Sequence, residues 1–160
     1  MRSAVDVAYY MLKLAADKGL EMTNLKLQKL VYIAHGYMWA LANKPLIDEA
    51  PQAWKYGPVI HSVYGQFRKY VDQRIQIDTS KIPEDLLDDK EKEVIEAVLD
   101  TYGQESAIDL VNLTHQPDTP WDEIWNRHGG KDQLFAEIPD PLIKNHFLKA
   151  VTDSSSVNGL

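Results

Sequence analysis

Residues 23–36 read T-N-L-K-L-Q-K-L-V-Y-I-A-H-G, and the rest of the chain can be arranged around this segment. Thr23 is a good N-cap and Pro45 stops any helix that begins there, so the pattern predicts a helix over residues 23–43. At about 100° per residue, apolar or aromatic side chains cover most of its circumference, which is typical of a helix in the middle of a bundle. Its predicted core face comprises Leu27, Leu30, Val31, Ala34, Tyr37, Met38 and Leu41.

Two features of this predicted helix are unusual. Lys26 and Lys29 lie in its first turn, where positive charge opposes the helix dipole. They either meet carboxylates of this chain or of a partner, or they are plain exposed lysines. Gly36 costs about 1 kcal/mol of helix stability relative to alanine, which predicts a close crossing by another backbone.

Start and stop signals predict helices on both sides of this segment. Ser3 can cap a helix that ends before Gly19, and an apolar stripe over residues 86–102 is followed by Gly103. Ser106 can start a further helix, which would bury Ile108, Leu110, Val111 and Leu113. The pairs Thr119-Pro120 and Asp140-Pro141 each place a capping residue before proline, which predicts two more helix starts.

The predicted fold class is therefore mainly α. We expect a compact bundle of about six or seven helices around the helix at 23–43, with at most a small strand pair near 47–56 and 75–78. We expect residues 1–151 to form a single domain, followed by a polar, frayed tail at 152–160.

Composition and charge exclude several classes of protein. Apolar residues make up 44% and charged residues 26%, and the absence of cysteine excludes disulfides, thiol nucleophiles and thiolate metal sites. With no signal-peptide pattern, and with the apolar stretch at 30–41 interrupted by His35 and Gly36, we expect a cytoplasmic protein that does not enter membranes.

The net charge of −7 is concentrated in one segment. Residues 78–105 hold ten acidic and three basic residues, so the rest of the chain is balanced. A balanced remainder argues against nucleic-acid binding, including the role of a DNA-binding repressor. The acidic segment is either a solvated helix face or a contact for a basic partner.

Residues 53–59 read A-W-K-Y-G-P-V. In an extended stretch, Trp54 and Tyr56 would face one side and Lys55 the other. Pro58 suits the first turn of a third helix, which would bury Val59, Val63, Phe67 and Val71. Two interpretations remain open: a structural corner pinned by two aromatics, or a protein-binding surface, because Trp and Tyr dominate interface hot spots.

The sequence contains no familiar catalytic or phosphate-binding signature, such as G-x-x-x-x-G-K-[ST], G-x-G-x-x-G, H-E-x-x-H or G-x-S-x-G. No two of its histidines lie four residues apart. We therefore predict no cofactor, no metal and no catalytic residue. The alternative is a hydrolase in which His61 and His115, with a carboxylate such as Asp122, bind zinc or perform acid–base chemistry.

Three motifs in order resemble one known family. K-L-Q-K-L at 26–30, A-W-K-Y-G-P-V at 53–59 and T-H-Q-P-D-T-P-W at 114–121 are together similar to the Panacea domain of SocA-like and phage-associated antitoxin proteins. The resemblance covers roughly residues 3–150. It implies a non-enzymatic antitoxin that neutralises a toxin encoded nearby by direct binding. Some members instead act as adaptors that deliver the toxin to a protease.

The resemblance does not separate interface residues from framework residues. We expect partner binding by Lys26, Gln28, Lys29, Tyr32, Trp54, Lys55 and Tyr56. We expect a structural role for Gly57, Pro58, Thr114, His115, Pro120 and Trp121.

Overall fold

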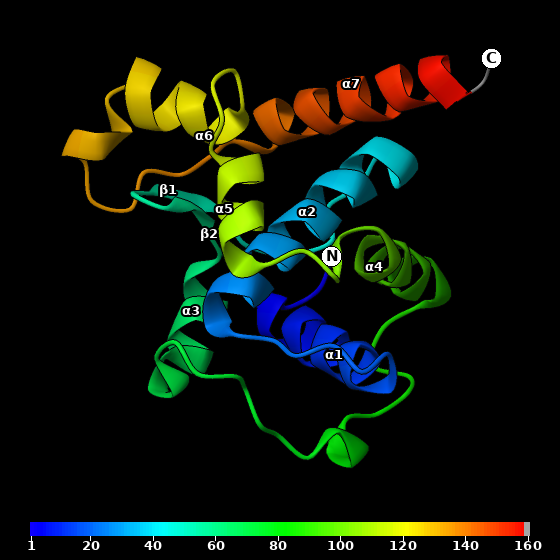
Figure 1. The fold of residues 1–160 in the computed structure, drawn as a ribbon. Helices are drawn as coiled ribbons and strands as arrows, with labels where there is room; N and C mark the ends of the chain where they lie inside the picture. Colours follow the sequence, from blue (N-terminus) through cyan, green and yellow to red (C-terminus); the bar gives the residue numbers. More distant parts are fainter. Residues whose placement is uncertain (159–160) are drawn as a thin grey trace.

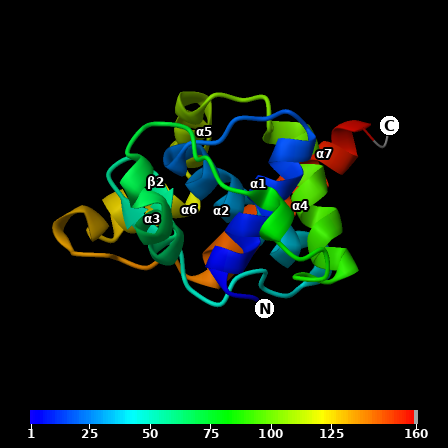
Figure 2. The same cartoon turned by 90° about the horizontal axis from the view of Figure 1, so that it is seen from below.

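The computed structural model describes residues 1–158, and its helices pack around α2 (Asn24–Ala42), as Figure 1 shows. The longer helices around it are α1 (Ala4–Asp17), α4 (Asp89–Tyr102), α5 (Ala107–Thr114) and α7 (Asp140–Asn158). Helix α7 crosses α2 on one side, and α1 and α3 (His61–Phe67) cover it on the other, as the view from below shows (Figure 2). The predicted mainly α fold with a central helix is confirmed.

The predicted helix starts are formed by side-chain caps. Thr23 Oγ1 accepts a hydrogen bond from the backbone N–H of Lys26 at 3.3 Å, and Ser106 caps α5 in the same way. Asp88 and Glu91 form a reciprocal capping box at the start of α4. These bonds satisfy amide groups that lack a partner within the helix, which explains why the helices begin where the sequence places them.

Short elements connect the long helices. They are the strands β1 (Gln52–Trp54) and β2 (Gly57–Val59), the 3-10 helices η1 (Arg68–Tyr70), η2 (Thr79–Lys81) and η4 (Gly130–Asp132), and α6 (Pro120–Asp122) with the π-helical turn η3 (Glu123–Arg127). Thr119 caps α6 and Pro120 is its first residue, as predicted.

The small strand pair is present, but its partners differ from the prediction. β1 pairs antiparallel with β2, and residues 75–78 do not join this sheet. The backbone N–H of Ile75 instead donates to the carbonyl of Met22 at 2.7 Å. Residues 57–59 form the partner strand instead, although their Gly-Pro pair has the local signal of a helix start.

The third helix begins at His61, so the prediction that Pro58 opens it is wrong. Pro58 lies in β2 opposite Ala53, and at this position of the ladder the N–H and carbonyl groups point away from the partner strand. The missing N–H of proline is therefore harmless there. Val63 and Phe67 are buried as predicted, whereas Val71 is 76% exposed because α3 ends before it.

The core face of α2 is largely as predicted, with Leu41 the exception at 52% exposure. In α5, Leu110 and Val111 are buried, but Ile108 and Leu113 are exposed. Gly36 does mark a close approach, although by a side chain rather than a backbone: an added Cβ would overlap the ring of Phe147 from α7.

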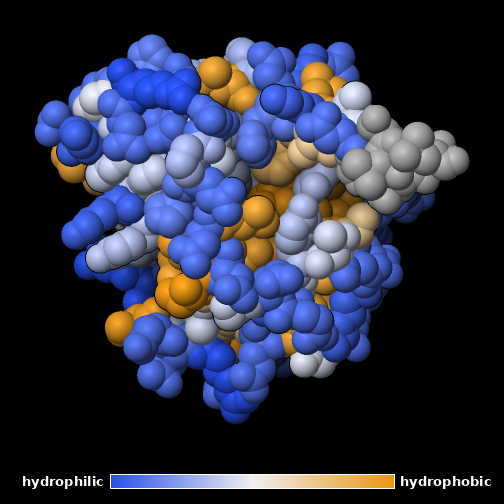
Figure 3. All heavy atoms as spheres, turned by 45° about the horizontal axis from the view of Figure 1, so that its top comes forward, coloured by the Kyte–Doolittle hydropathy of each residue, from blue (hydrophilic) through white to orange (hydrophobic). Residues whose placement is uncertain are grey.

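Helix α7 continues into the segment expected as a polar tail, and residues 159–160 lie outside the described part of the chain. No helix within residues 1–158 is long and apolar enough to span a membrane. The face in Figure 3 is mostly hydrophilic, with hydrophobic atoms gathered in a band across its middle. An apolar hollow between α2, α4 and α7 is lined by Tyr37, Leu41, Val94, Ala97, Val98, Thr101, Tyr102 and Val151.

Candidate partner-binding site

The stretch A-W-K-Y-G-P-V forms a tight hairpin. Trp54 pairs with Gly57, which leaves Lys55 and Tyr56 as the two residues of the turn. Gly57 has φ +110°, a conformation that residues with a side chain rarely adopt. The expected extended alternation is therefore wrong: Trp54 is half-buried, whereas Lys55 and Tyr56 are both exposed at the tip.

Two buried side chains of α2 hold the outer edge of β2. The ammonium of Lys29 donates to the carbonyl of Pro58 at 2.8 Å, and Gln28 Oε1 accepts from the backbone N–H of Ile60 at 2.7 Å. The amide of Gln28 also donates to Asn24 Oδ1 at 3.0 Å. These groups occupy the positions that a third strand would take, so the hairpin is attached to the helix through side chains.

Residues of the first and third motifs approach the second motif at Gly57. A Cβ added there would lie 3.2 Å from Cε of Lys29 and 3.3 Å from Oγ1 of Thr114. Thr114 directs its hydroxyl to the carbonyl of Leu110 at 2.8 Å. Residues from all three motifs therefore converge on one point of the structure, where a side chain would be crowded and the positive φ favours glycine.

Trp121 fixes strand β1. Its indole Nε1 donates to the carbonyl of Trp54 at 2.6 Å, and its ring lies 5.2 Å from that of His115 and 5.8 Å from that of Trp125. Pro120 places Trp121 in the first turn of α6. The residues expected to be structural thus surround the base of the hairpin and leave its tip exposed.

Lys26 lies apart from this cluster. Its ammonium donates to the carbonyl of Gly103 at 2.6 Å, just past the last residue of α4. Desolvation lowers the pKa of Lys26. Both lysines in the first turn of α2 thus donate to carbonyl groups of this chain, Lys26 at the end of α4 and Lys29 at Pro58. The carboxylate of Glu105 also acts on Lys26, in the direction that raises its pKa.

Burial changes the role that the sequence suggested for three residues. Gln28, Lys29 and Tyr32 are at most 2% exposed, so in this structure they support the surface from beneath. The Tyr32 hydroxyl has no hydrogen-bond partner within the described residues, and burial raises its pKa. Tyr32 lines a separate small cavity of about 110 Å³ with Thr114 and Pro120.

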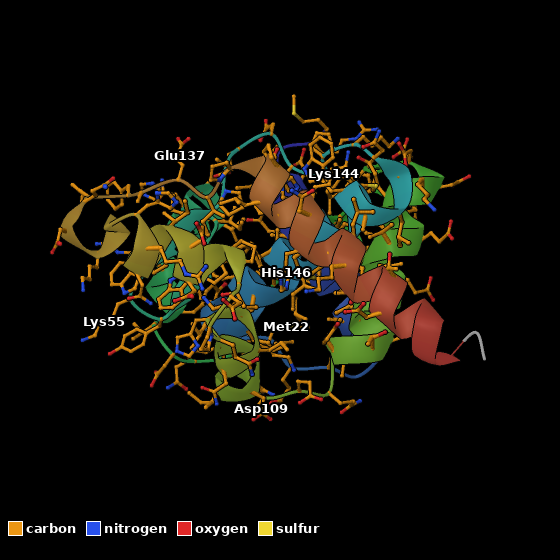
Figure 4. The ribbon with its side chains drawn as sticks, turned by 90° about the horizontal axis from the view of Figure 1, so that it is seen from above. Met22, Lys55, Asp109, Glu137, Lys144 and His146 are labelled. Atoms are coloured by element: carbon orange, nitrogen blue, oxygen red, sulfur yellow. The ribbon has the colours of Figure 1, made fainter. Side chains whose placement is uncertain are left out.

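A groove of about 380 Å³ runs beside the hairpin. Its lining brings together five of the seven residues predicted to bind a partner, with Lys26 and Tyr32 outside it. The lining residues are Asn24, Leu25, Gln28, Lys29, Trp54, Lys55, Tyr56, Val59, Tyr64 and Val71. Figure 4 shows Lys55 at the periphery of the molecule.

Aromatic rings form one wall of this groove and extend beyond it. The ring of Trp54 lies 5.0 Å from Tyr64 and stacks at 5.6 Å on Phe135, which also lies 4.9 Å from His61. Sequence reasoning missed Phe135. Its position in the loop after η4 is fixed because residues 136–138 pair with β1 and the residue before it. No local sequence pattern indicates this pairing.

Burial of Lys29 makes the free energy of unfolding depend on pH. Desolvation by burial lowers the pKa of its ammonium to about 7, below the usual value of about 10.4 in an unfolded chain. Between these two values the unfolded chain binds the proton more tightly, so the free energy of unfolding rises as the pH rises. We expect a slope of at most about 1.4 kcal/mol per pH unit from this group.

The measurement is urea unfolding at pH 7 and pH 9 for the wild type, for Lys29→Met and for the exposed-lysine control Lys81→Met. The wild type and Lys81→Met should gain stability over this interval relative to Lys29→Met. Equal changes in all three proteins would show that Lys29 is charged in the folded state at both pH values.

The structure places His61 and His115, the histidines of the hydrolase alternative, against aromatic rings. His61 packs on Trp54 and Phe135, and His115 on Trp121. Asp122 accepts from the Asn126 amide and the Asp118 backbone N–H, which lower the pKa of its carboxyl. Within residues 1–158, no group of three or more His, Asp or Glu side chains is placed to hold a metal ion.

The fold and this site define a helical domain that presents a small aromatic hairpin beside a groove. Comparison with known proteins places the chain in a family. The sequence profile of the family described as "Antitoxin SocA-like, Panacea domain" matches residues 27–122, which include the hairpin, the second and third motifs, and the first motif except for Lys26. The chain belongs to this family.

One curated relative extends the similarity over most of the chain. It is "Antitoxin SocA" of Caulobacter vibrioides (strain NA1000 / CB15N), 36% identical over 156 residues, an alignment that covers 88% of this chain and 80% of the relative. No solved structure matches this chain.

Proposed function

We propose that this protein is the antitoxin of a toxin–antitoxin pair and neutralises its toxin by direct binding in the cytoplasm. Family membership supports the antitoxin role. In this proposal residues 1–151 act as one domain. The toxin binds the surface formed by Trp54, Lys55, Tyr56 and the groove beside them, which we call the hairpin surface.

The observation that carries this choice of surface is the exposure of Tyr56. It is 62% exposed at the tip of a turn, although the rest of the hairpin is tightly held by Lys29, Gln28 and Trp121. A large aromatic on a preorganised frame loses little conformational entropy when it binds, which is why such residues serve as anchors of interfaces.

The test begins with co-purification of this protein with the products of neighbouring genes. We expect recovery of one protein that is toxic when expressed alone and harmless when co-expressed. Tyr56→Ala should then weaken the complex by about 2 kcal/mol, close to 30-fold in the dissociation constant, with an unchanged circular dichroism spectrum.

Leu41→Ala is the matched control. Leu41 is also a large, exposed apolar residue, but it lines the hollow between α2, α4 and α7. It should leave the affinity unchanged. If Leu41→Ala weakens the complex and Tyr56→Ala does not, the toxin binds the other hollow; if no neighbouring protein is recovered, the antitoxin proposal itself fails.

A further inference from the structure

Val71 has a backbone conformation that the free protein does not explain. Its φ is +55° and its ψ is −116°, a region that suits glycine and that is an outlier for a β-branched residue. Its N–H donates to Arg68 at 3.0 Å, and the N–H of Gln73 donates to Tyr70 at 2.9 Å, so the turn is well formed. Strain of this kind is concentrated at functional sites in proteins.

The side chain of Val71 receives no compensating burial. It is 76% exposed and stands at the groove beside the hairpin. Phe135 repeats the combination: it has φ +60° and is exposed, next to the aromatic wall of the same surface. Two apolar side chains are thus displayed by unfavourable backbone conformations: Val71 lines the groove together with Trp54, and Phe135 stacks on Trp54.

The charge of the groove is opposite to that of the whole protein. The chain carries −7, yet the only charged residues among the described lining of the groove are Lys29 and Lys55. Lys55 lies over the ring of Tyr56 at 5.5 Å and forms no ion pair with any residue of the described chain. Its ammonium is therefore available at the mouth of the groove.

The side-chain amides that line the groove are already engaged. The amide of Gln28 is bonded to Asn24 and to Ile60, and the amide of Asn24 donates to the carbonyl of Tyr64 at 3.2 Å. The groove can therefore contribute apolar walls, one positive charge and the hydroxyls of Tyr56 and Tyr64, but no free side-chain amide for the backbone of a ligand.

We propose that this groove binds a segment of the toxin in which one or two apolar side chains contact Val71, Tyr56 and Trp54, while an adjacent Asp or Glu pairs with Lys55. The proposal rests on the antitoxin function proposed above. The groove volume of about 380 Å³ is sufficient for one or two side chains, so the part of the toxin that enters it is a short segment.

The experiment measures the dissociation constant of the purified co-recovered toxin for the wild type and three variants. Lys55→Glu should weaken binding at least tenfold, mainly through a slower association that depends less on salt. Val71→Gly should weaken binding about tenfold, yet raise the thermal midpoint of the free antitoxin by roughly 2–4 °C, because relief of the strain exceeds the entropic cost of glycine. Lys81→Glu, on η2 outside the groove, should change neither quantity.

A charge exchange then tests the acidic residue. Each Asp and Glu of the toxin is replaced in turn by lysine, and one such variant should restore binding to Lys55→Glu. If the toxin binds the wild type but none restores binding, or if Lys55→Glu and Val71→Gly bind as the wild type does, the groove proposal is overturned while the antitoxin function stands. If no toxin binds the wild type, both proposals fall together.

Discussion

Replacing His35 with alanine is expected to lower the free energy of unfolding by about 3–5 kcal/mol. His35 is fully buried in α2, and its Nδ1 accepts hydrogen bonds from the backbone N–H groups of Leu46 and Ile47 at 3.2 and 3.4 Å. Because Nδ1 accepts, the ring proton is on Nε2, which donates to Asp140 Oδ1 at 2.9 Å. One imidazole therefore joins α2, the loop after it and the start of α7.

The size of this effect depends on the two backbone groups. Alanine would leave both N–H groups buried without a partner and would open a cavity, and each of these costs more than an exposed ion pair contributes. Asp140 is partly exposed, so water can solvate its carboxylate after the imidazole is removed.

Asp140→Asn is the control that separates the two contributions. We expect it to cost about 1 kcal/mol or less, measured like His35→Ala by urea unfolding at pH 7. If Asp140→Asn is as destabilising as His35→Ala, the contact with α7, and not the bonds to Leu46 and Ile47, is the main contribution of this histidine.

Gly36→Ala is expected to destabilise the protein by about 2 kcal/mol, although alanine is the better helix former. The added methyl group would overlap the ring of Phe147, which is itself buried and packs against Tyr32 at 5.9 Å and Tyr37 at 5.1 Å. The cost of moving this ring exceeds the gain of about 1 kcal/mol in helix propensity.

A double-mutant cycle tests this explanation, because the effect of Gly36→Ala on stability should change sign when the ring of Phe147 is removed. In a Phe147→Ala background the space above Gly36 is open, so Gly36→Ala should be neutral or stabilising by up to about 1 kcal/mol. Both pairs are compared by chemical unfolding. If Gly36→Ala is equally destabilising in both backgrounds, the ring of Phe147 is not what excludes a side chain at this position.

Local chemistry made much of the fold predictable. The caps at Ser3, Thr23, Ser106 and Thr119 and the apolar periodicity of the segments that follow them are properties of neighbouring residues, and the structure contains helices at all four places. The predictions went wrong at residues 54–59, because a two-residue turn and a helix start have similar local signals.

The candidate site was only partly predictable for the same reason. The motif residues do assemble at one place, but the sequence could not tell which of them would be covered. Lys29 is a polar residue that local reasoning places on a surface, and the carbonyl of Pro58, 29 positions away, gives it a buried partner instead. Conversely, Tyr56 and Val71 are exposed because each lies in a turn, whereas the sequence pattern predicted an extended stretch for Tyr56 and a helix for Val71.

The amino-acid sequence was therefore sufficient for the mainly α class, the central helix and the family, because these depend on short-range periodicity, capping and ordered motifs. The division between frame and exposed surface required the folded chain. Burial and hydrogen bonding of Lys29, Gln28 and His35 arise from segments far apart in sequence, and only their packing determines which polar groups lose water and which remain available to a partner.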